Sequence, residues 1–308
     1  MSYPYFDAHC DTVSACRNGG QLWENQGQLD LKRLGQYRPA GQIFAIYHDA
    51  QQAPPDGMFA ECRRQYELFL QQMQKNAARV AFCPDGSSVE MVNNTGLTAA
   101  LLSIEGADLI DCDPDKLELV KGWGVKCINL TWNRANALSG SCVEESDRGL
   151  SPLGKEFVRR AQELDILVDV SHLSDAGFWD VAEISSRPII ASHSNSRSIC
   201  PHPRNLTDEQ FSAIVKMRGF VGLNLYAPFV GQPATAEKLV EHLEHFLSLG
   251  GETTVGFGAD FDGCDVLVEE ISGVQDIPKL LPALQAKKYR EKFLSDLFYG
   301  NLLSVLRR

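Results

Sequence analysis

Short runs of apolar, often β-branched residues alternate with amphipathic patterns along all 308 residues of the chain. Buried parallel strands, covered on both faces, have near-continuous apolar sequences of this length. About eight runs in alternation with helices predict an α/β fold, a (β/α)8 TIM-like barrel, although a doubly wound open sheet shares the local pattern. The predicted strands cover residues 5–9, 42–48, 99–105, 125–131, 166–172, 188–193, 219–226 and 254–260.

Helix patterns fill the gaps between these runs, with apolar residues recurring at intervals of three and four. Ser151 before Pro152 and Thr207 before two acidic residues are typical of helix N-termini. One pattern is weaker than the others because Gly177 interrupts it. The predicted helices cover residues 58–73, 151–164, 174–184, 206–217 and 236–251.

Three further observations concern the organisation of the chain. No GxGxxG motif follows the first run, which argues against an open dinucleotide-binding sheet and favours the barrel. No composition shift or repeat divides the sequence, so we expect a single domain over residues 1–308. The long stretch between the second and third runs is expected to contain a small hairpin around residues 78–86.

The net charge argues against two kinds of binding partner, and the cysteine spacing argues against one kind of metal site. The formal net charge of -11 argues against nucleic acid and anionic membranes, because both attract positive proteins. The sequence has no basic segment followed by an apolar one at its start and no long apolar run, so we expect a cytoplasmic protein. None of the nine cysteines forms a CxxC pair, which fits reduced thiols rather than a structural zinc knuckle.

Polar residues with metal-binding side chains fall at the carboxyl ends of the predicted strands. In a barrel these ends meet on one face, where active sites are built. Their convergence would bring together three imidazoles and three carboxylates, a set that suits zinc or a similar divalent ion better than magnesium or calcium. The residues are His9, Asp11, Glu105, His172, His193 and Asp260.

The natural arrangement of these residues is a pair of metal ions bridged by Glu105. His9 and Asp11 are two residues apart, so on a strand both side chains point the same way and can reach one ion, while His172 and His193 hold the other. Such a pair generates a bridging hydroxide, and Asp260 is left to take and return the proton.

Each residue alone also has a purely structural interpretation. His9 could be a hydrogen-bonded core histidine, and Glu105 could cap the segment after it. His193 could orient a loop. The other histidines do not share the placement at strand ends and are expected to be structural or solvated; they include His48, His242 and His245.

The sequence resembles the membrane (renal) dipeptidases of the amidohydrolase superfamily. The shared motifs, in order, are DAHCD, SIEGAD, INLTWN, VDVSH followed by SDA, PIIASHSNSRSICPHPRN and GFGADFDG. The resemblance implies a metal-dependent hydrolase barrel with two Zn²⁺ per subunit, bridged by Glu105, that hydrolyses dipeptides. It assigns the same five metal ligands and the acid/base role of Asp260, and it implies that Arg204 holds the substrate's terminal carboxylate.

One residue departs from the family pattern. Where the mammalian-type motif has a histidine that contacts the substrate carbonyl oxygen, this sequence has Trp132. Indole donates one hydrogen bond and carries no charge, and losing an oxyanion donor costs about 10²- to 10³-fold in turnover. Either a neighbour substitutes, or the zinc ions do more, or the substrate differs. The candidate neighbours are Asn133, Arg134 and Asn136.

The sequence therefore predicts a metallo-dipeptidase that acts on small dipeptides. Trp132, Asn133 and Tyr226 are expected to contact the substrate beside Arg204. An N-acyl amino acid hydrolase with the same metal centre is the alternative enzyme, and a non-catalytic metal-binding barrel is the alternative from another class. The resemblance also implies a homodimer.

Overall fold

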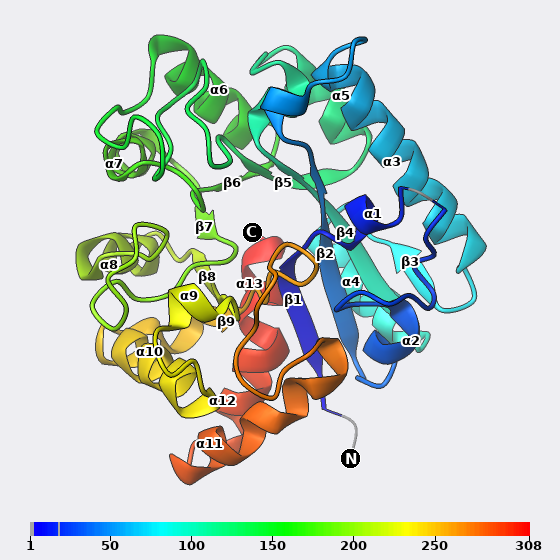
Figure 1. The fold of residues 1–308 in the computed structure, drawn as a ribbon, viewed down its shortest axis with the longest axis vertical. Coiled ribbons are helices and arrows are strands. Elements are labelled where there is room, and N and C mark those ends of the chain that lie inside the picture. The colour runs from blue at the N-terminus through cyan, green and yellow to red at the C-terminus, as the bar shows by residue number, and fades with distance from the viewer. Residues whose placement is uncertain (1–2, 18) are drawn as a thin grey trace.

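A computed structural model describes residues 3–17 and 19–308 of the chain. Within these residues, eight parallel strands close into a barrel in the order β2-β1-β9-β8-β7-β6-β5-β4, because β4 also pairs with β2 (Figure 1). The barrel predicted from the sequence is therefore confirmed. The strands are β1 (Tyr5–Cys10), β2 (Ala40–Tyr47), β3 (Val80–Phe82), β4 (Thr98–Glu105), β5 (Val125–Asn129), β6 (Leu167–Asp169), β7 (Ile190–Ala191), β8 (Phe220–Leu223) and β9 (Val255–Phe257).

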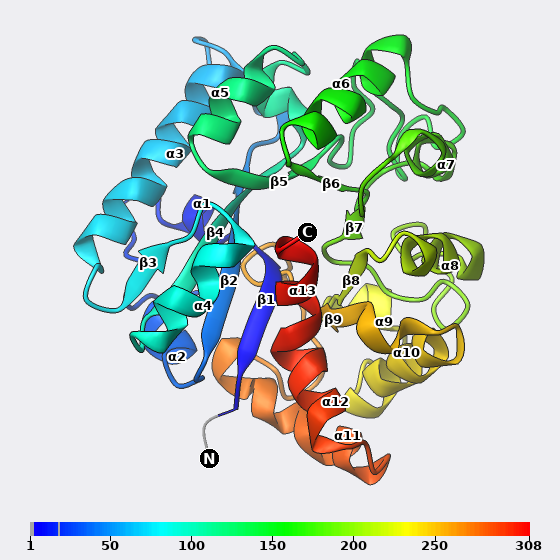
Figure 2. The same cartoon turned by 180° about the vertical axis from the view of Figure 1, so that it is seen from behind.

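Helices surround the barrel and connect its strands (Figures 1 and 2). The five predicted helices all form, and Ser151 and Thr207 cap α6 and α8 through their side chains as expected. The helices are α1 (Thr12–Ala15), α2 (Leu31–Leu34), α3 (Met58–Lys75), α4 (Gly86–Asn94), α5 (Lys116–Gly122), α6 (Pro152–Glu163), α7 (Asp175–Ile184), α8 (Asp208–Lys216), α9 (Ala227–Val230), α10 (Ala236–Ser248), α11 (Leu281–Ala286), α12 (Glu291–Ser295) and α13 (Asn301–Leu306).

The extra hairpin expected around residues 78–86 is wrong. Residues 80–82 form β3, which runs parallel to β4 and pairs with its first half, Val80 opposite Thr98 and Phe82 opposite Ala100. Helix α4 follows β3, so this segment is another strand–helix unit rather than a hairpin. A parallel connection needs such a crossover, whereas the sequence between the two strands does not distinguish the two arrangements.

Two buried clusters separate the inside of the barrel from its outer layer. The inner cluster takes alternate residues from β1, β2, β4, β5, β6, β7 and β8, such as Ala99 and Leu101, whose neighbours Ala100 and Leu102 pack in the outer cluster. Leucines of α13, including Leu302 and Leu306, belong to the inner cluster. Helix α13 therefore closes the amino end of the barrel, and Figure 2 shows it across the middle of the molecule.

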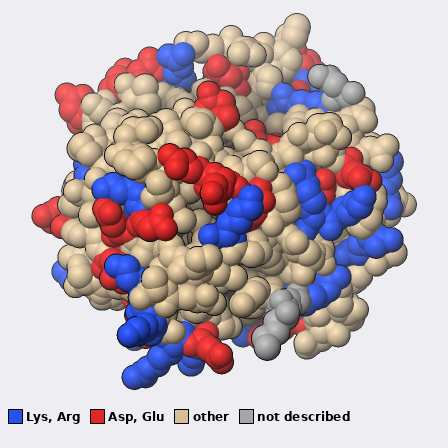
Figure 3. Space-filling model, turned by 60° about the horizontal axis from the view of Figure 1, so that its bottom comes forward, with Lys and Arg blue, Asp and Glu red and all other residues tan. Residues whose placement is uncertain are grey.

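The surface carries charges of both signs. Figure 3 shows acidic and basic side chains interspersed over one face of the molecule. Among the described residues, no helix has the length and apolar character needed to cross a bilayer.

Candidate active site

The end of β1 carries an irregularity that turns His9 toward the barrel opening. The pairing of β1 with β2 shifts by one residue between Asp7 and Cys10, so β1 holds one extra residue there. An extra residue reverses which side chains face inward. Accordingly, Ala8 packs in the inner cluster and Cys10 in the outer one, and the His9 imidazole between them joins the site.

The other metal-binding side chains come from strand ends and from the turns just beyond them. Glu105 is the last residue of β4, on the same inward alternation as Ala99 and Leu101. His172 and Asp260 follow their strands in backbone conformations with φ of 71° and 64°. Residues other than glycine rarely adopt a positive φ, and those that do are often found at functional sites.

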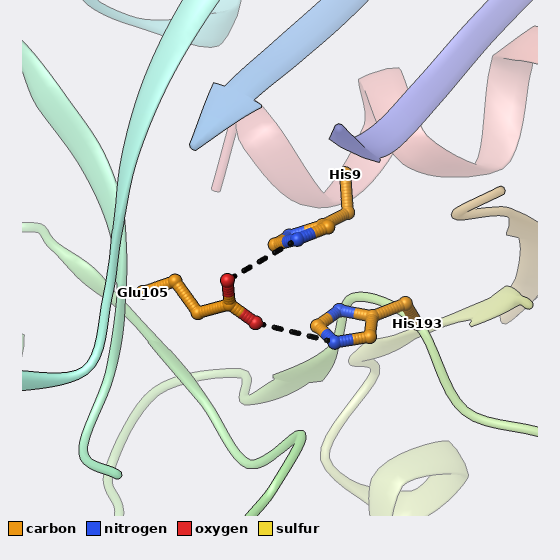
Figure 4. A group of neighbouring side chains, drawn as sticks. All are labelled: His9, Glu105 and His193. Carbon is orange, nitrogen blue, oxygen red and sulfur yellow. Dashed lines mark ion pairs between the residues drawn. The ribbon is translucent and has the colours of Figure 1, made fainter. Parts of the chain in front are cut away.

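Glu105 lies between two groups of side chains, with His9 on one side and His193 on the other (Figure 4). Its Oε2 is 3.6 Å from His9 Nε2, and its Oε1 is 2.9 Å from His172 Nε2 and 3.6 Å from His193 Nε2. The same His9 nitrogen lies 3.5 Å from Asp11 Oδ2 and is therefore close to a second carboxylate. One carboxylate thus joins the group around His9 to the pair His172 and His193.

The two histidines of that pair are oriented through their Nδ1 atoms. His172 Nδ1 lies 3.0 Å from Asn133 Oδ1, which only accepts hydrogen bonds, so the proton is on Nδ1. The bare Nε2 lone pair of His172 then faces Glu105 Oε1 at 2.9 Å and His193 Nε2 at 2.9 Å. Ser192 Oγ contacts His193 Nδ1 at 2.7 Å. A lone pair that faces a carboxylate oxygen, as that of His172 faces Glu105, is an arrangement that a cation between the two atoms stabilises.

Burial and mutual charge shift the pKa values of the cluster. Burial opposes the charged form of His9, but Glu105, Asp11 and Asp260 outweigh it and raise the pKa of His9 to about 10. Burial lowers the pKa of both His172 and His193 well below the usual value, and it raises the pKa of Glu105. Carboxylates crowded around imidazoles, of which His172 and His193 are kept neutral by burial, are an arrangement that positive charge stabilises.

These donors fit divalent metal ions. His9 Nε2 and Asp11 Oδ1 are buried and have no hydrogen-bond partner among the described residues. His9, Glu105 and His193 offer donor atoms within 4.8 Å of one another, as do His9, Asp11 and Asp260. Imidazole nitrogens with carboxylate oxygens are zinc-type donors. The site therefore has room and ligands for a metal centre at the carboxyl end of the barrel.

Asp260 is held next to this cluster by a residue that the sequence analysis missed. Asn224 Nδ2 donates to Asp260 Oδ2 at 3.0 Å, while Oδ1 of the same carboxylate lies 3.9 Å from His9 Nε2. Burial raises the pKa of Asp260 to about 6. The backbone is packed so closely here that a Cβ atom at Gly263 would lie 2.3 Å from both Asp11 Oδ2 and Asp260 Oδ1. Glycine therefore lets the loop after β9 cover the cluster.

A cavity of about 580 Å³ opens directly over the cluster. All four residues predicted to contact the substrate line its wall, opposite or beside the metal-binding side chains. The Arg204 guanidinium is buried, and its Nη2 has no hydrogen-bond partner in the part of the chain that the structure describes. The four residues are Trp132, Asn133, Arg204 and Tyr226.

The surroundings of Trp132 show which of its sequence neighbours can reach a bound substrate. Asn136 is fully engaged: its Nδ2 donates to Asp108 and Leu130, and its Oδ1 accepts from two backbone N–H groups. Arg134 bonds to Gln51 through Nη2. Asn133, by contrast, lines the cavity. Of the three neighbours considered from the sequence, Asn133 is the one placed to reach a substrate.

Tyr47 is a second residue that the sequence analysis missed. It is the last residue of β2, and its ring centroid lies 4.7 Å from that of Trp132. The two rings form one aromatic wall of the cavity. Tyr47 ends a predicted strand just as Glu105 does, so its position was readable, but an aromatic residue there does not by itself indicate a site.

The histidines expected to be structural lie outside the cluster. His242 is fully buried, accepts from the Ser196 N–H at 3.0 Å and bonds to the Val230 carbonyl oxygen at 2.9 Å through Nε2. His245 pairs with Asp208 at 2.8 Å. His48 contacts Arg17 at 3.1 Å. All nine cysteines have free thiols.

Comparisons with known proteins agree with this geometry. The sequence model of the membrane dipeptidase family, peptidase family M19, matches residues 1–308. A metallopeptidase from Rhodobacter sphaeroides, solved with a phosphinate mimic of the dipeptide L-Ala-D-Ala, is 30% identical with a TM-score of 0.89, covering 100% of this chain and 99% of that one. The family M19 metallopeptidase dipeptidase AC is 30% identical, with a TM-score of 0.90 and the same coverage. Dipeptidase tcpJ of Claviceps purpurea is 26% identical over 294 residues, 91% of this chain and 69% of that protein.

Proposed function

The chain belongs to the membrane dipeptidase family and is a metallo-dipeptidase, and we propose that it uses two Zn²⁺ ions bridged by Glu105. His9 and Asp11 hold one ion, and His172 and His193 hold the other. When bound, the two ions turn a shared water into hydroxide near neutral pH and polarise the scissile carbonyl group. Asn133 and Ser192 fix the ring orientation of His172 and His193, which keeps both Nε2 lone pairs directed at the site.

Asp260 moves the proton in this proposal. Its Oδ2 is tied to Asn224, while its Oδ1 faces the cluster. A carboxyl group with a pKa of about 6 can take a proton from the attacking water and return it to the leaving amine. Asn224 keeps the carboxylate from rotating away during this exchange.

Arg204 binds the substrate's terminal carboxylate across the cavity. Its guanidinium lies 5.4 Å from the Phe229 ring centroid, and its buried Nη2 lacks a partner within the described residues. A guanidinium in this state can donate two parallel hydrogen bonds to a carboxylate. The fixed span from Arg204 to the metal-binding cluster then selects peptides whose scissile bond is one residue from the C-terminus.

A single observation carries this proposal: buried polar atoms without hydrogen-bond partners lie on two sides of one cavity, which Asp11 and Arg204 line and next to which His9 contacts Asp11. His9 Nε2 and Asp11 Oδ1 lie on the metal side, and Arg204 Nη2 lies on the carboxylate side. Unsatisfied buried groups are costly, so they persist where a ligand completes them. A dipeptide between two metal ions and a guanidinium does so.

The test is a steady-state panel on the zinc-loaded protein. Small dipeptides are compared with N-acetyl and N-formyl amino acids, and elemental analysis counts the metal. We expect dipeptide turnover with two zinc ions per chain. Preferred turnover of the N-acyl compounds would establish the acyl amino acid hydrolase instead, and a fully metal-loaded protein inert to both would remove the proposal.

Two further predictions concern the protein in the cell and in solution. A cytoplasmic location and a homodimer stay predictions from the sequence and its resemblance. Cell fractionation tests the first, and light scattering coupled to size-exclusion chromatography tests the second.

A further inference from the structure

The position of Arg204 has to be set by its backbone. Its guanidinium lies over the Phe229 ring, and its Nη2 has no hydrogen-bond partner among the described residues. A cation over an aromatic face is attracted but is not held at one point as a hydrogen-bonded fork is. Other contacts must therefore fix the backbone at residues 203–205.

Arg197 holds the chain on both sides of Arg204. Its Nε donates to the Asn205 carbonyl oxygen at 2.7 Å, and its Nη2 donates to the Pro203 carbonyl oxygen at 3.1 Å. The Arg197 backbone N–H also donates to the Leu206 carbonyl oxygen at 2.8 Å. One guanidinium therefore binds the carbonyl oxygens of the residues before and after Arg204.

That guanidinium is itself fixed to the scaffold. Arg197 makes two parallel hydrogen bonds to Asp175, Nη1 to Oδ2 at 2.6 Å and Nη2 to Oδ1 at 2.8 Å. Asp175 is the first residue of α7, directly after its N-cap Ser174, and its Oδ1 also accepts from Gln210 of α8 at 2.8 Å. The carboxylate thus connects Arg197 to the first turns of two helices.

Only a guanidinium can make this set of contacts. The Arg197 bonds use Nε and both Nη atoms in one plane, which a lysine ammonium cannot reproduce. A charge-preserving change to lysine therefore removes side-chain hydrogen bonds to the segment without removing the positive charge, while Asn205 keeps its bonds to Asn195 and Cys200. Shifts of about 1 Å in a substrate-holding group can cost about 10²-fold in rate.

We propose that Arg197, held by Asp175, is a positioning residue that sets the distance between Arg204 and the metal-binding cluster and so enforces selection for a C-terminal carboxylate. This inference rests on the proposed role of Arg204. Arg197 does not line the cavity, so a substrate bound there would not touch it. It acts through the backbone of the segment that carries Arg204.

The experiment measures a ratio on one protein sample. The zinc-loaded full chain is assayed with a good dipeptide and with its C-terminal amide, and kcat/KM for the acid is divided by kcat/KM for the amide. This ratio does not depend on the fraction of active protein, so partial unfolding or metal loss cancels. Arg197→Lys is compared with Arg204→Met, which removes the carboxylate-binding group.

A second variant and a control complete the design. Asp175→Asn keeps the start of α7 but weakens the anchor of Arg197, and it replaces Arg197→Lys if that variant does not fold. Arg64→Lys is the matched control, because Arg64 likewise binds carboxylates, those of Asp56 and Glu61, but lies outside the cavity lining.

We expect the ratio to fall about tenfold or more in Arg197→Lys, by less in Asp175→Asn, and not in Arg64→Lys. In Arg204→Met it should approach one. An unchanged ratio in Arg197→Lys with a collapsed ratio in Arg204→Met overturns the inference and leaves the proposed function intact. An unchanged ratio in Arg204→Met removes the carboxylate clamp from the proposed function, and the inference falls with it.

Discussion

At the amino end of the barrel, Lys126 is 1% exposed, and its ammonium lies 3.1 Å from Asp165 Oδ2. Arg187 pairs with the same carboxylate. At the carboxyl end, His9 and Arg204 are buried to a similar degree, yet each has a side-chain nitrogen with no hydrogen-bond partner among the described residues. At the amino end of the barrel, buried charges pair with other residues of the chain. At the carboxyl end, buried donor and acceptor atoms are left free to bind a ligand.

This difference separates buried charges that stabilise the fold from buried polar groups that bind a ligand. A buried charge with its own partner contributes to folding, and losing that partner lowers stability. A buried polar group without one lowers stability already, so removing it should reduce activity and leave the fold unharmed. Substitutions at the two ends should therefore change different measurements.

The largest effect is expected at the carboxylate that joins the two halves of the site. Glu105→Gln should lower kcat/KM for dipeptides by on the order of 10³-fold, because a neutral amide cannot bridge two cations. Elemental analysis should show metal loss, while the thermal midpoint of the metal-free variant should equal or exceed that of the metal-free parent. A metal-free variant that melts well below its parent would show that Glu105 supports the fold and would weaken the contrast between the two ends.

The next largest effect is expected at the other side of the cavity. Arg204→Met should lower kcat/KM for dipeptides on the order of 10²-fold, because the substrate carboxylate loses a buried partner. Metal content and thermal midpoint should match the parent. Arg64→Lys, a change at an arginine outside the cavity lining, is the control and should leave kcat/KM within twofold.

At the amino end, the same kind of change should alter stability and not activity. Asp165→Asn should destabilise the fold by about 3 kcal/mol, at the lower end of the range for breaking a buried pair, because Asp165 itself is 41% exposed. Lys126→Met should cost less, since it leaves no unpaired buried charge. Denaturant unfolding checks both. If Lys126→Met proved the more harmful of the two, the ion pair would not be what stabilises this end.

The smallest effect concerns a histidine that is satisfied inside the chain. Burial lowers the pKa of His242 to about 4, below the usual 6.5. The unfolded chain binds a proton there at higher pH than the folded one, so this contribution is complete above pH 6.5 and shrinks as the pH falls towards 4.

Between pH 7 and 5 the loss at His242 amounts to about 2 kcal/mol. The unfolding free energy of the parent should therefore fall more steeply over this range than that of His242→Gln, which cannot titrate. Parallel slopes for the two proteins would mean that His242 does not stay neutral in the fold.

Much of the barrel was predictable from the sequence because its strands are buried on both faces. Each of the eight predicted apolar runs contains a strand, but six of these strands end earlier than the runs do, while β1 ends one residue later and β4 ends at the predicted residue. For example, residues 166–172 contain only Leu167–Asp169 as a strand, and His172 lies in a turn with positive φ. Polar residues such as His172 lie just beyond the hydrogen-bonded part of the sheet, where they form the site. Residue type alone does not predict their backbone angles.

The geometry of the site was predictable only in part. The structure places His9 Nε2 3.5 Å from Asp11 Oδ2, but not through the expected alternation along a strand, because Asp11 lies one residue past β1. Asn224 and Tyr47 were missed since an amide or a phenol at a strand end carries no metal-binding signal. Their roles depend on contacts with residues far along the chain, 36 positions away for Asn224 and Asp260.

The extra residue in β1 has a consequence for how this scaffold can be altered by insertion and deletion. Without it, the inward parity of Phe6 and Ala8 would carry on to Cys10, and the imidazole of His9 would point to the outer layer. In a regular strand of this sequence, the Cys10 thiol would therefore take the inward place that the His9 imidazole now holds, whereas deleting Ala8 would remove the irregularity and keep the imidazole inward. Two neighbouring residues of the DAHCD motif are thus alternative occupants of one position, and the pairing register of β1 with β2 selects between them.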